Sequence, residues 1–122
     1  MKGSFIWGGR NVSISVDPDE ATLEDALALA TRLLENFEDF VRRSKDELLK
    51  ECFAMYNDDW RREGDPVLTA EEFLANFHLT AINILGDKSV DFFYNEGGMF
   101  GNHCMIPQIF DGENFDGVMM YG

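Results

Sequence analysis

The stretch HLTAINILGDKSVDFFYNEGGMFGNHCMI, residues 78–106, decides the fold. Apolar and aromatic residues fill two of its segments, which predicts β-strands from His78 to Leu85 and from Val90 to Asn95. Glycine-bearing turns at 86–88 and 96–98 follow them, and a third strand is expected from Met99 to Ile106. Because connections this short join strands that run in opposite directions, the three strands predict an antiparallel sheet.

The flanking segments extend this sheet. Downstream, an acidic loop is expected at 111–117 and a closing strand from Val118 to Tyr121. Near the N-terminus, Phe5 to Trp7 is expected to form a short strand before a turn at 8–11. Residues 12–16 then alternate apolar and polar side chains, which indicates a half-buried strand and therefore an N-terminal hairpin.

Helices are expected between the hairpin and the later strands. Three starts pair a hydroxyl residue with an acid three positions later, the pattern of a capping box: Thr22 with Asp25, Ser44 with Glu47, and Thr69 with Glu72. The first helix has one apolar face, made by Leu23, Leu27, Ala30, Leu34, Phe37 and Val41. The second places inward Leu48, Leu49, Cys52, Phe53 and Tyr56. It fades near Trp60, and the pattern leaves open whether the chain bends at Ser44; Phe73, Leu74 and Phe77 make a short third helix.

These elements predict one α+β domain over residues 1–122. Its antiparallel sheet combines the N-terminal hairpin with the C-terminal strands, and two to three helices pack on one face. A chain of this length buries roughly two thirds of its unfolded surface, enough for one core.

The chain is strongly acidic. It has 10 Lys and Arg residues against 23 Asp and Glu residues, a formal net charge of −13, and from Glu63 onward Lys88 is the only base. Such a surface repels phosphate backbones and anionic lipids, so nucleic-acid and membrane binding are disfavoured. It attracts a basic protein surface or a cation. The alternative is that the acids only keep the domain in solution.

The cysteines and the N-terminus predict a cytoplasmic protein. Cys52 and Cys104 show no CxxC spacing, which suits a reducing compartment. No apolar stretch approaches the roughly 18 residues of a membrane span. The N-terminal segment breaks at Gly8-Gly9 before a signal-peptide core could form.

The C-terminal part of the chain gathers His103, Cys104 and an acidic loop, which suggests a metal or catalytic site. In a regular strand, however, neighbouring residues point to opposite faces, so His103 and Cys104 could not share a metal or act as base and nucleophile. The loop that begins at Asp111 has Phe115 and Asp116 where a calcium loop needs an oxygen ligand and a glycine. We therefore expect no metal, no cofactor and no catalytic residues, and a surface loop that is simply acidic.

The run Phe92-Phe93-Tyr94-Asn95-Glu96-Gly97-Gly98-Met99-Phe100, followed by His103, Gly117 and Gly122, resembles the bacterial domain-of-unknown-function family 2262. The helix pair, the helix start at Thr69 and the N-terminal Trp-Gly hairpin fall in similar places, so the resemblance spans most of the chain. Asn102 here separates Gly101 from the histidine, whereas the family pattern puts glycine directly before it. Families of this kind occur at bacterial polymorphic-toxin loci, and the resemblance implies an immunity role without catalytic residues.

The first functional hypothesis is a non-enzymatic protein-binding module, such as an immunity protein that neutralises a basic toxin. Its expected partner contacts are acids, aromatic anchors and one histidine of the C-terminal half: Asp87, Asp91, Tyr94, Glu96, Phe100, His103, Asp111, Glu113, Phe115 and Asp116. The alternative is a small-molecule or cation-binding protein, or an enzyme, that uses a sheet pocket near His103 and Trp7. A third hypothesis is an accessory domain that dimerises through a sheet edge, and the oligomeric state is left open.

Overall fold

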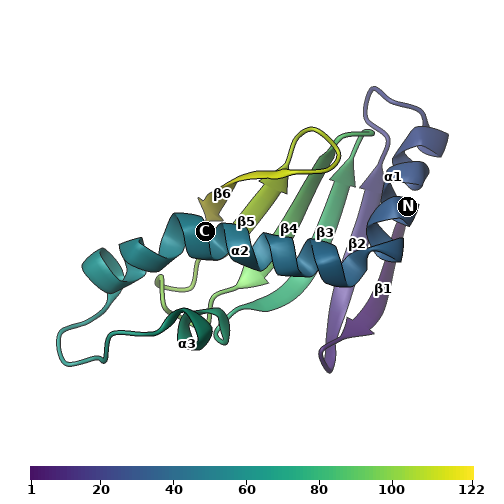
Figure 1. Cartoon of the computed structure of the whole chain (residues 1–122). Helices are drawn as coiled ribbons and strands as arrows, with labels where there is room; N and C mark the ends of the chain where they lie inside the picture. The colour runs from purple at the N-terminus through teal and green to yellow at the C-terminus, as the bar shows by residue number, and fades with distance from the viewer.

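The computed structural model describes residues 1–122 and contains a six-stranded sheet with three α-helices. In chain order the elements are β1 Lys2–Trp7, β2 Arg10–Asp17, α1 Leu23–Glu35, α2 Phe37–Met55, a π-helical turn Tyr56–Trp60, α3 Ala70–Leu74, β3 His78–Leu85, β4 Ser89–Asn95, β5 Cys104–Ile109 and β6 Phe115–Tyr121. The helices lie on one face of the sheet, and α2 runs across the strands (Figure 1). The predicted α+β class is confirmed.

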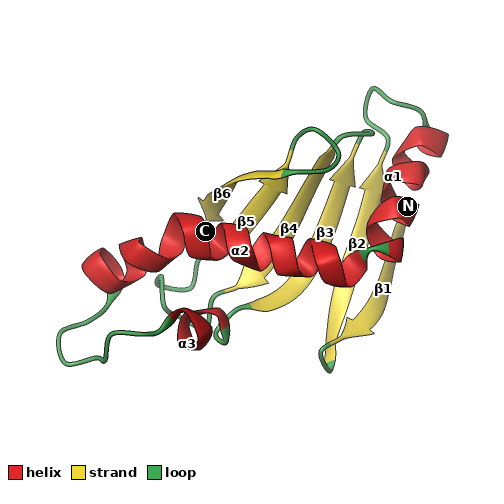
Figure 2. Ribbon diagram, in the orientation of Figure 1, coloured by secondary structure: helices red, strands yellow, loops and turns green.

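The strands follow one another in the sheet in the order of the sequence, from β1 to β6. All neighbours are antiparallel except β2 and β3, which run parallel, with Ser13 opposite Ala81 and Asp17 opposite Leu85. The purely antiparallel sheet of the prediction is therefore corrected at this one pair. Residues 18–77, which carry all three helices, return the chain to the end of the sheet where β2 began, as a parallel pair requires (Figure 2).

The first predicted helix is divided in two. The Oγ1 atom of Thr22 accepts a hydrogen bond from the Asp25 amide at 3.1 Å, so α1 begins where predicted. Asn36, with φ −120°, interrupts the helix before α2 starts. The expected apolar face is wrong at Leu23 and Leu34, which are each 45% exposed. The apolar face was predicted for one continuous helix, and the interruption at Asn36 changes which side chains face the sheet.

The second capping box is also wrong, because α2 passes through Ser44 without a break. The buried Ser44 hydroxyl donates to the Val41 carbonyl at 2.7 Å and lies 2.5 Å from the Tyr94 hydroxyl. The Glu47 carboxylate accepts a hydrogen bond from the Gly117 amide of β6 at 2.6 Å. Both side chains therefore fasten α2 to the sheet.

The end of α2 and the start of α3 agree with the prediction. The helical path loosens into the π-helical turn that ends at Trp60. At the start of α3, the Thr69 hydroxyl accepts from the Glu72 amide at 3.2 Å, and the Glu72 carboxylate accepts from the Thr69 amide at 2.9 Å. This reciprocal pair is the predicted capping box.

The strand expected from Met99 to Ile106 is displaced, because β5 begins only at Cys104. The carboxylate of Glu96 accepts hydrogen bonds from the amides of Gly98 and Phe100. Those amides are thus unavailable to a neighbouring strand, and residues 96–103 form a turn instead.

The loop before β6 is shorter than expected. The Asp111 carboxylate accepts from the amides of Glu113 and Asn114, at 2.9 and 2.7 Å. This closes the turn within residues 110–114, so β6 starts at Phe115 rather than at Val118. Asp116 and Gly117, expected in the loop, belong to the strand.

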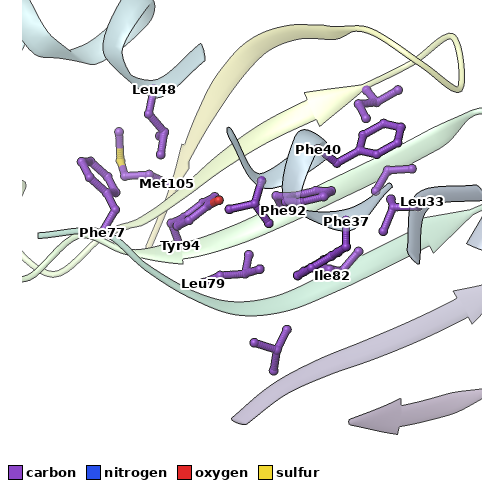
Figure 3. Packing of buried hydrophobic residues seen from close by; sticks show 14 of the residues in the cluster. Leu33, Phe37, Phe40, Leu48, Phe77, Leu79, Ile82, Phe92, Tyr94 and Met105 are labelled. Carbon is purple, nitrogen blue, oxygen red and sulfur yellow. The ribbon is translucent and has the colours of Figure 1, made fainter. Parts of the chain in front are cut away.

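The core lies between the helices and one face of the sheet. Its cluster of 23 buried residues comes mainly from the three helices and from strands β2 to β5, while partly buried residues of β1 and β6 pack against it. Figure 3 shows Tyr94, Phe92 and Met105 of the sheet beneath Leu48 of α2. Along β4 the side chains of even number are buried and those of odd number are more exposed, as expected for a strand covered on one face. None of the helices is both long enough and apolar enough to span a lipid bilayer.

Candidate functional site

The turn between β4 and β5 is held by a buried carboxylate. Glu96 is only 1% exposed, and its two oxygens accept hydrogen bonds from the Gly98 and Phe100 amides. Phe100 is fully buried, with its ring 5.6 Å from that of Tyr56 and 5.5 Å from that of Trp60. Because both oxygens are engaged by backbone amides, Glu96 serves the turn and is not placed to act as a base.

His103 lies at the end of this turn, half-buried against Trp60 at 6.0 Å between ring centroids. Its Nδ1 atom hydrogen-bonds the Phe100 carbonyl, which accepts, so Nδ1 carries the proton. A pocket of about 190 Å³ adjoins the ring and is lined mainly by polar residues, including Asn102 and Thr80. Burial raises the pKa of the neighbouring Cys104 thiol, which keeps it protonated.

No group of three or more His, Cys, Asp or Glu side chains is close enough to hold a metal ion. His103 precedes β5 and is not part of a strand, so the predicted strand alternation does not separate it from Cys104. What separates the pair chemically is the fixed Nδ1 contact and the protonated thiol. Nucleophilic catalysis would need a base in contact with the sulfur and a group that orients this base.

A second group of candidate side chains lies at the far end of the sheet. The end of β2, the β3–β4 turn and the β5–β6 loop meet there, at the upper end in Figure 1. The Gly86 amide donates to the Asp17 carbonyl and the Gly112 amide to the Lys88 carbonyl, both at 2.7 Å. These bonds hold the three loops together at this end of the sheet.

Two large apolar side chains are exposed on this edge. Leu85, the last residue of β3, is 48% exposed, and Phe110, directly after β5, is 53% exposed. Leu85 pairs with Asp17 on one side and with Ser89 on the other. Since Val90 pairs with Ile109, Phe110 continues the same row. We call this end the acidic rim and define it by its exposed acids and apolar residues, Asp17, Asp19, Leu85, Asp87, Phe110, Asp111 and Glu113. Lys88, a base in the β3–β4 turn, is exposed beside them.

The helices supply two cations beneath the rim, but both bind backbone oxygens. Arg32 donates to the Gly112 carbonyl at 3.0 Å, and Arg43 donates to the Glu113 carbonyl at 2.8 Å. The rim carboxylates thus stay free of these two partners. Hydrogen bonds from the Asn114 and Glu113 amides lower the pKa of Asp111 to about 2, so it is ionised at any ordinary pH.

The structure distributes the predicted partner contacts over several places. It brings Asp87, Asp111 and Glu113 together at the rim. Asp91 lies on the uncovered face of β4 and accepts from Gln108 at 3.1 Å. The others do not join the rim. Phe115 is half-buried against Phe92, and Asp116 is exposed on β6. His103 lies at the opposite end of the sheet, and three residues are buried: Tyr94, Glu96 and Phe100.

Burial removes Tyr94, Glu96 and Phe100 from any surface that a partner could reach. Conversely, Leu85 and Phe110 are exposed at the rim although neither was among the predicted partner contacts. A signal existed in the alternation of β5, because an outward position follows the buried Ile109. It could be used only once the end of that strand was known.

The fold and the site define a class: α+β proteins with one layer of helices on an open, mostly antiparallel sheet, and an acidic and apolar edge. Within this class, residues 1–115 match the sequence model of a family described as uncharacterised proteins conserved in bacteria (DUF2262), and the chain belongs to that family. No curated protein and no solved structure matches the chain. The resemblance carried by residues 92–100 is confirmed.

Proposed function

We propose that the protein is a non-enzymatic protein-binding module that binds a basic protein surface through the acidic rim. One observation carries the proposal: two large apolar side chains, Leu85 and Phe110, stand exposed in one row at an edge whose other exposed groups are mostly carboxylates. Apolar anchors surrounded by charged groups are the usual anatomy of a protein-binding surface.

The two kinds of side chain supply different parts of the binding free energy. A Phe side chain that becomes buried removes a large apolar area from water and serves as a central anchor. The carboxylates contribute mainly to the rate of encounter and to specificity. With a net charge of −13, the chain attracts a basic partner over a range that shortens as salt is added.

The proposed partner is a basic toxin of the same bacterium, with this protein as the immunity partner that neutralises it. The motivation is the match between the acidic rim and the positive surface that a nuclease, for example, presents to nucleic acid. Binding at that surface would block access to the substrate without any chemistry by the inhibitor.

Copurification from the native bacterium tests the proposal, with the bound protein identified by mass spectrometry. The informative variant is Asp87→Asn with Glu113→Gln, because both side chains are exposed and neither makes a hydrogen bond or ion pair in the structure. Its matched control is Asp58→Asn with Asp59→Asn, which removes the same charge from the exposed π-helical turn.

A second pair of variants tests the apolar part of the rim. Phe110→Ala should weaken binding of the identified partner at least tenfold, as expected for an anchor residue. Tyr121→Ala removes another exposed aromatic, 69% exposed on β6, and should leave binding unchanged. Recovery of the protein without a basic partner, or equal binding by rim and control variants, would refute the proposal.

The pocket beside His103 supports a second candidate, a small-molecule or cation-binding protein or an enzyme. The pocket has a volume of about 190 Å³ and a mainly polar lining, so it could hold a ligand of a few heavy atoms. A thermal-shift screen of ligands and divalent cations would test it, with His103→Ala as the comparison. A shift shared equally by both proteins, or no shift at all, would dismiss this candidate.

A further inference from the structure

A small pocket lies at the end of the sheet opposite the acidic rim, between the β1–β2 hairpin, α2 and the start of β3. Its volume is about 110 Å³. Trp7 and Phe77 contribute apolar walls, while Arg10, Lys45 and His78 contribute the charged and titratable lining. Trp7 pairs with Arg10 in the β1–β2 hairpin, and Arg10 and His78 line the same pocket.

The cations of this pocket have no counter-ion within the protein. No carboxylate lines the pocket, and neither Arg10 nor Lys45 forms an ion pair. The ion pairs use Arg42, Arg43 and Lys50 instead. Like charges held together without a counter-ion repel one another, which costs free energy. In a chain with more than twice as many acids as bases, such a grouping is the exception that a bound anion would explain.

The titratable groups of the pocket report the same electrostatics. Burial, followed by the charges of Arg10 and Lys45, lowers the pKa of His78. Tyr94 is the only other titratable group of the lining, and burial raises its pKa to about 12, so it stays neutral. An anion in the pocket would offset both neighbouring charges and favour the protonated imidazole.

We propose that this pocket binds a phosphate group, either as free phosphate or as the terminal group of a phosphate monoester. At about 110 Å³, the pocket has room for a small polar group of a few heavy atoms. Arg10 offers a planar fork of donors for two oxygens, and Lys45 offers a mobile point charge. Trp7 and Phe77 leave an apolar side for the remainder of a monoester.

The carboxylates of the rim do not prevent binding at this position. The rim lies seven residues away along β3, which is about 23 Å at roughly 3.3 Å per residue. That distance is well beyond the Debye length of about 8 Å at physiological ionic strength. The nearby cations therefore outweigh the distant carboxylates at the pocket.

The two histidines of the chain allow a direct test by NMR. The imidazole signals of His78 and His103 are followed over a pH titration with added inorganic phosphate, phenyl phosphate or sodium chloride, at constant ionic strength. Phosphate should raise the pKa of His78 in a saturable manner and leave that of His103 unchanged. Lys45→Gln should weaken phosphate binding about tenfold, the usual effect of losing one charge-assisted contact.

Lys50→Gln is the matched control, since Lys50 lies on the same helix, is exposed and faces Glu47 and Glu51. Equal affinity for the two phosphates would identify free phosphate as sufficient, and tighter binding of phenyl phosphate would identify a monoester; both support the proposal. A response reproduced by chloride, one that never saturates, or one shared by His78 and His103 would overturn it. The wild-type titration decides this even where a variant fails to fold, and circular dichroism checks the variants.

Discussion

The hydroxyl pair of Ser44 and Tyr94 should show strong energetic coupling. Both side chains are fully buried, and their oxygens lie 2.5 Å apart. Since the Ser44 proton is donated to the Val41 carbonyl, the Tyr94 hydroxyl donates to Ser44. The two residues are 50 positions apart, so this contact joins α2 to β4 across the core.

The three possible variants should differ in a definite order. Tyr94→Phe removes one hydrogen bond but leaves Ser44 paired with Val41, which should lower the free energy of unfolding by about 1 kcal/mol. Ser44→Ala leaves the buried Tyr94 hydroxyl without a partner, and this should cost about 2 kcal/mol. The double variant leaves no polar group unpaired and should cost about 1 kcal/mol, less than Ser44→Ala alone. The coupling free energy is therefore expected to be about 2 kcal/mol.

Urea unfolding followed by circular dichroism measures these values, provided that the slope with urea is unchanged. Ser13→Ala and Tyr121→Phe, at exposed positions, are the controls and should be nearly neutral. Additive effects of Ser44→Ala and Tyr94→Phe would contradict the buried pair. A smaller cost for Ser44→Ala than for Tyr94→Phe would mean that water reaches the Tyr94 hydroxyl, which the structure excludes.

Gly97→Ala should destabilise the fold by about 2–3 kcal/mol, since φ is +67° and a Cβ would lie 3.1 Å from the Asn76 carbonyl oxygen. Gly64→Ala, at φ +92° in open space, should cost less in the same urea assay, and equal costs would contradict the close approach. Phe100→Ala should cost about 3–5 kcal/mol in urea unfolding because this ring is fully buried, and a cost below 1 kcal/mol would place it at the surface. The carboxyl of Asp111 should titrate near pH 2 by NMR. Its contribution to the free energy of unfolding is complete above its ordinary pKa of 3.8 and disappears as the pH falls toward 2. Asp111→Ala should therefore flatten the pH dependence of the free energy of unfolding in that window.

The parts of the fold that could be predicted depend on neighbouring residues. The strand from His78 to Leu85 has its predicted bounds, and the helices start at Thr22 and Thr69 as predicted, although the reciprocal capping box forms only at Thr69. In each case the signal, alternation or a cap, involves residues within a few positions of one another. The β1–β2 hairpin is predictable for the same reason, because Gly8 and Gly9 both adopt positive φ.

The parts that could not be predicted depend on distant contacts. Ser44 and Glu47 have the spacing of a capping box, but their partners are 50 and 70 residues away. A local pattern cannot tell a cap from an anchor of this kind. The same limit hid the role of Glu96, whose carboxylate replaces a strand by a turn.

For the candidate site, composition indicated the acidic character of the surface but not which residues the fold would bring together there. The acids Asp87, Asp111 and Glu113 were expected to bind a partner, and the fold gathers them at one edge. The exposed aromatic residue at that end of the sheet is Phe110. Of the anchors predicted from the sequence, Tyr94 and Phe100 are in the core and Phe115 is half-buried. An aromatic residue is favourable in both settings, so only the packing decides between them.

The sheet separates two regions of opposite charge, and this separation makes the two proposals independent. The rim and the cationic pocket lie at opposite ends of β3, about 23 Å apart at roughly 3.3 Å per residue. No residue belongs to both, and the strands between them are joined to α2 through a tightly packed core. Because neither ligand would contact the other site, and a rigid core offers no second arrangement for either to select, the coupling free energy should be close to zero. Saturating phosphate should therefore leave the affinity of the rim for a basic partner unchanged at constant ionic strength. A change of tenfold or more would require a conformational change that links the two ends of the sheet.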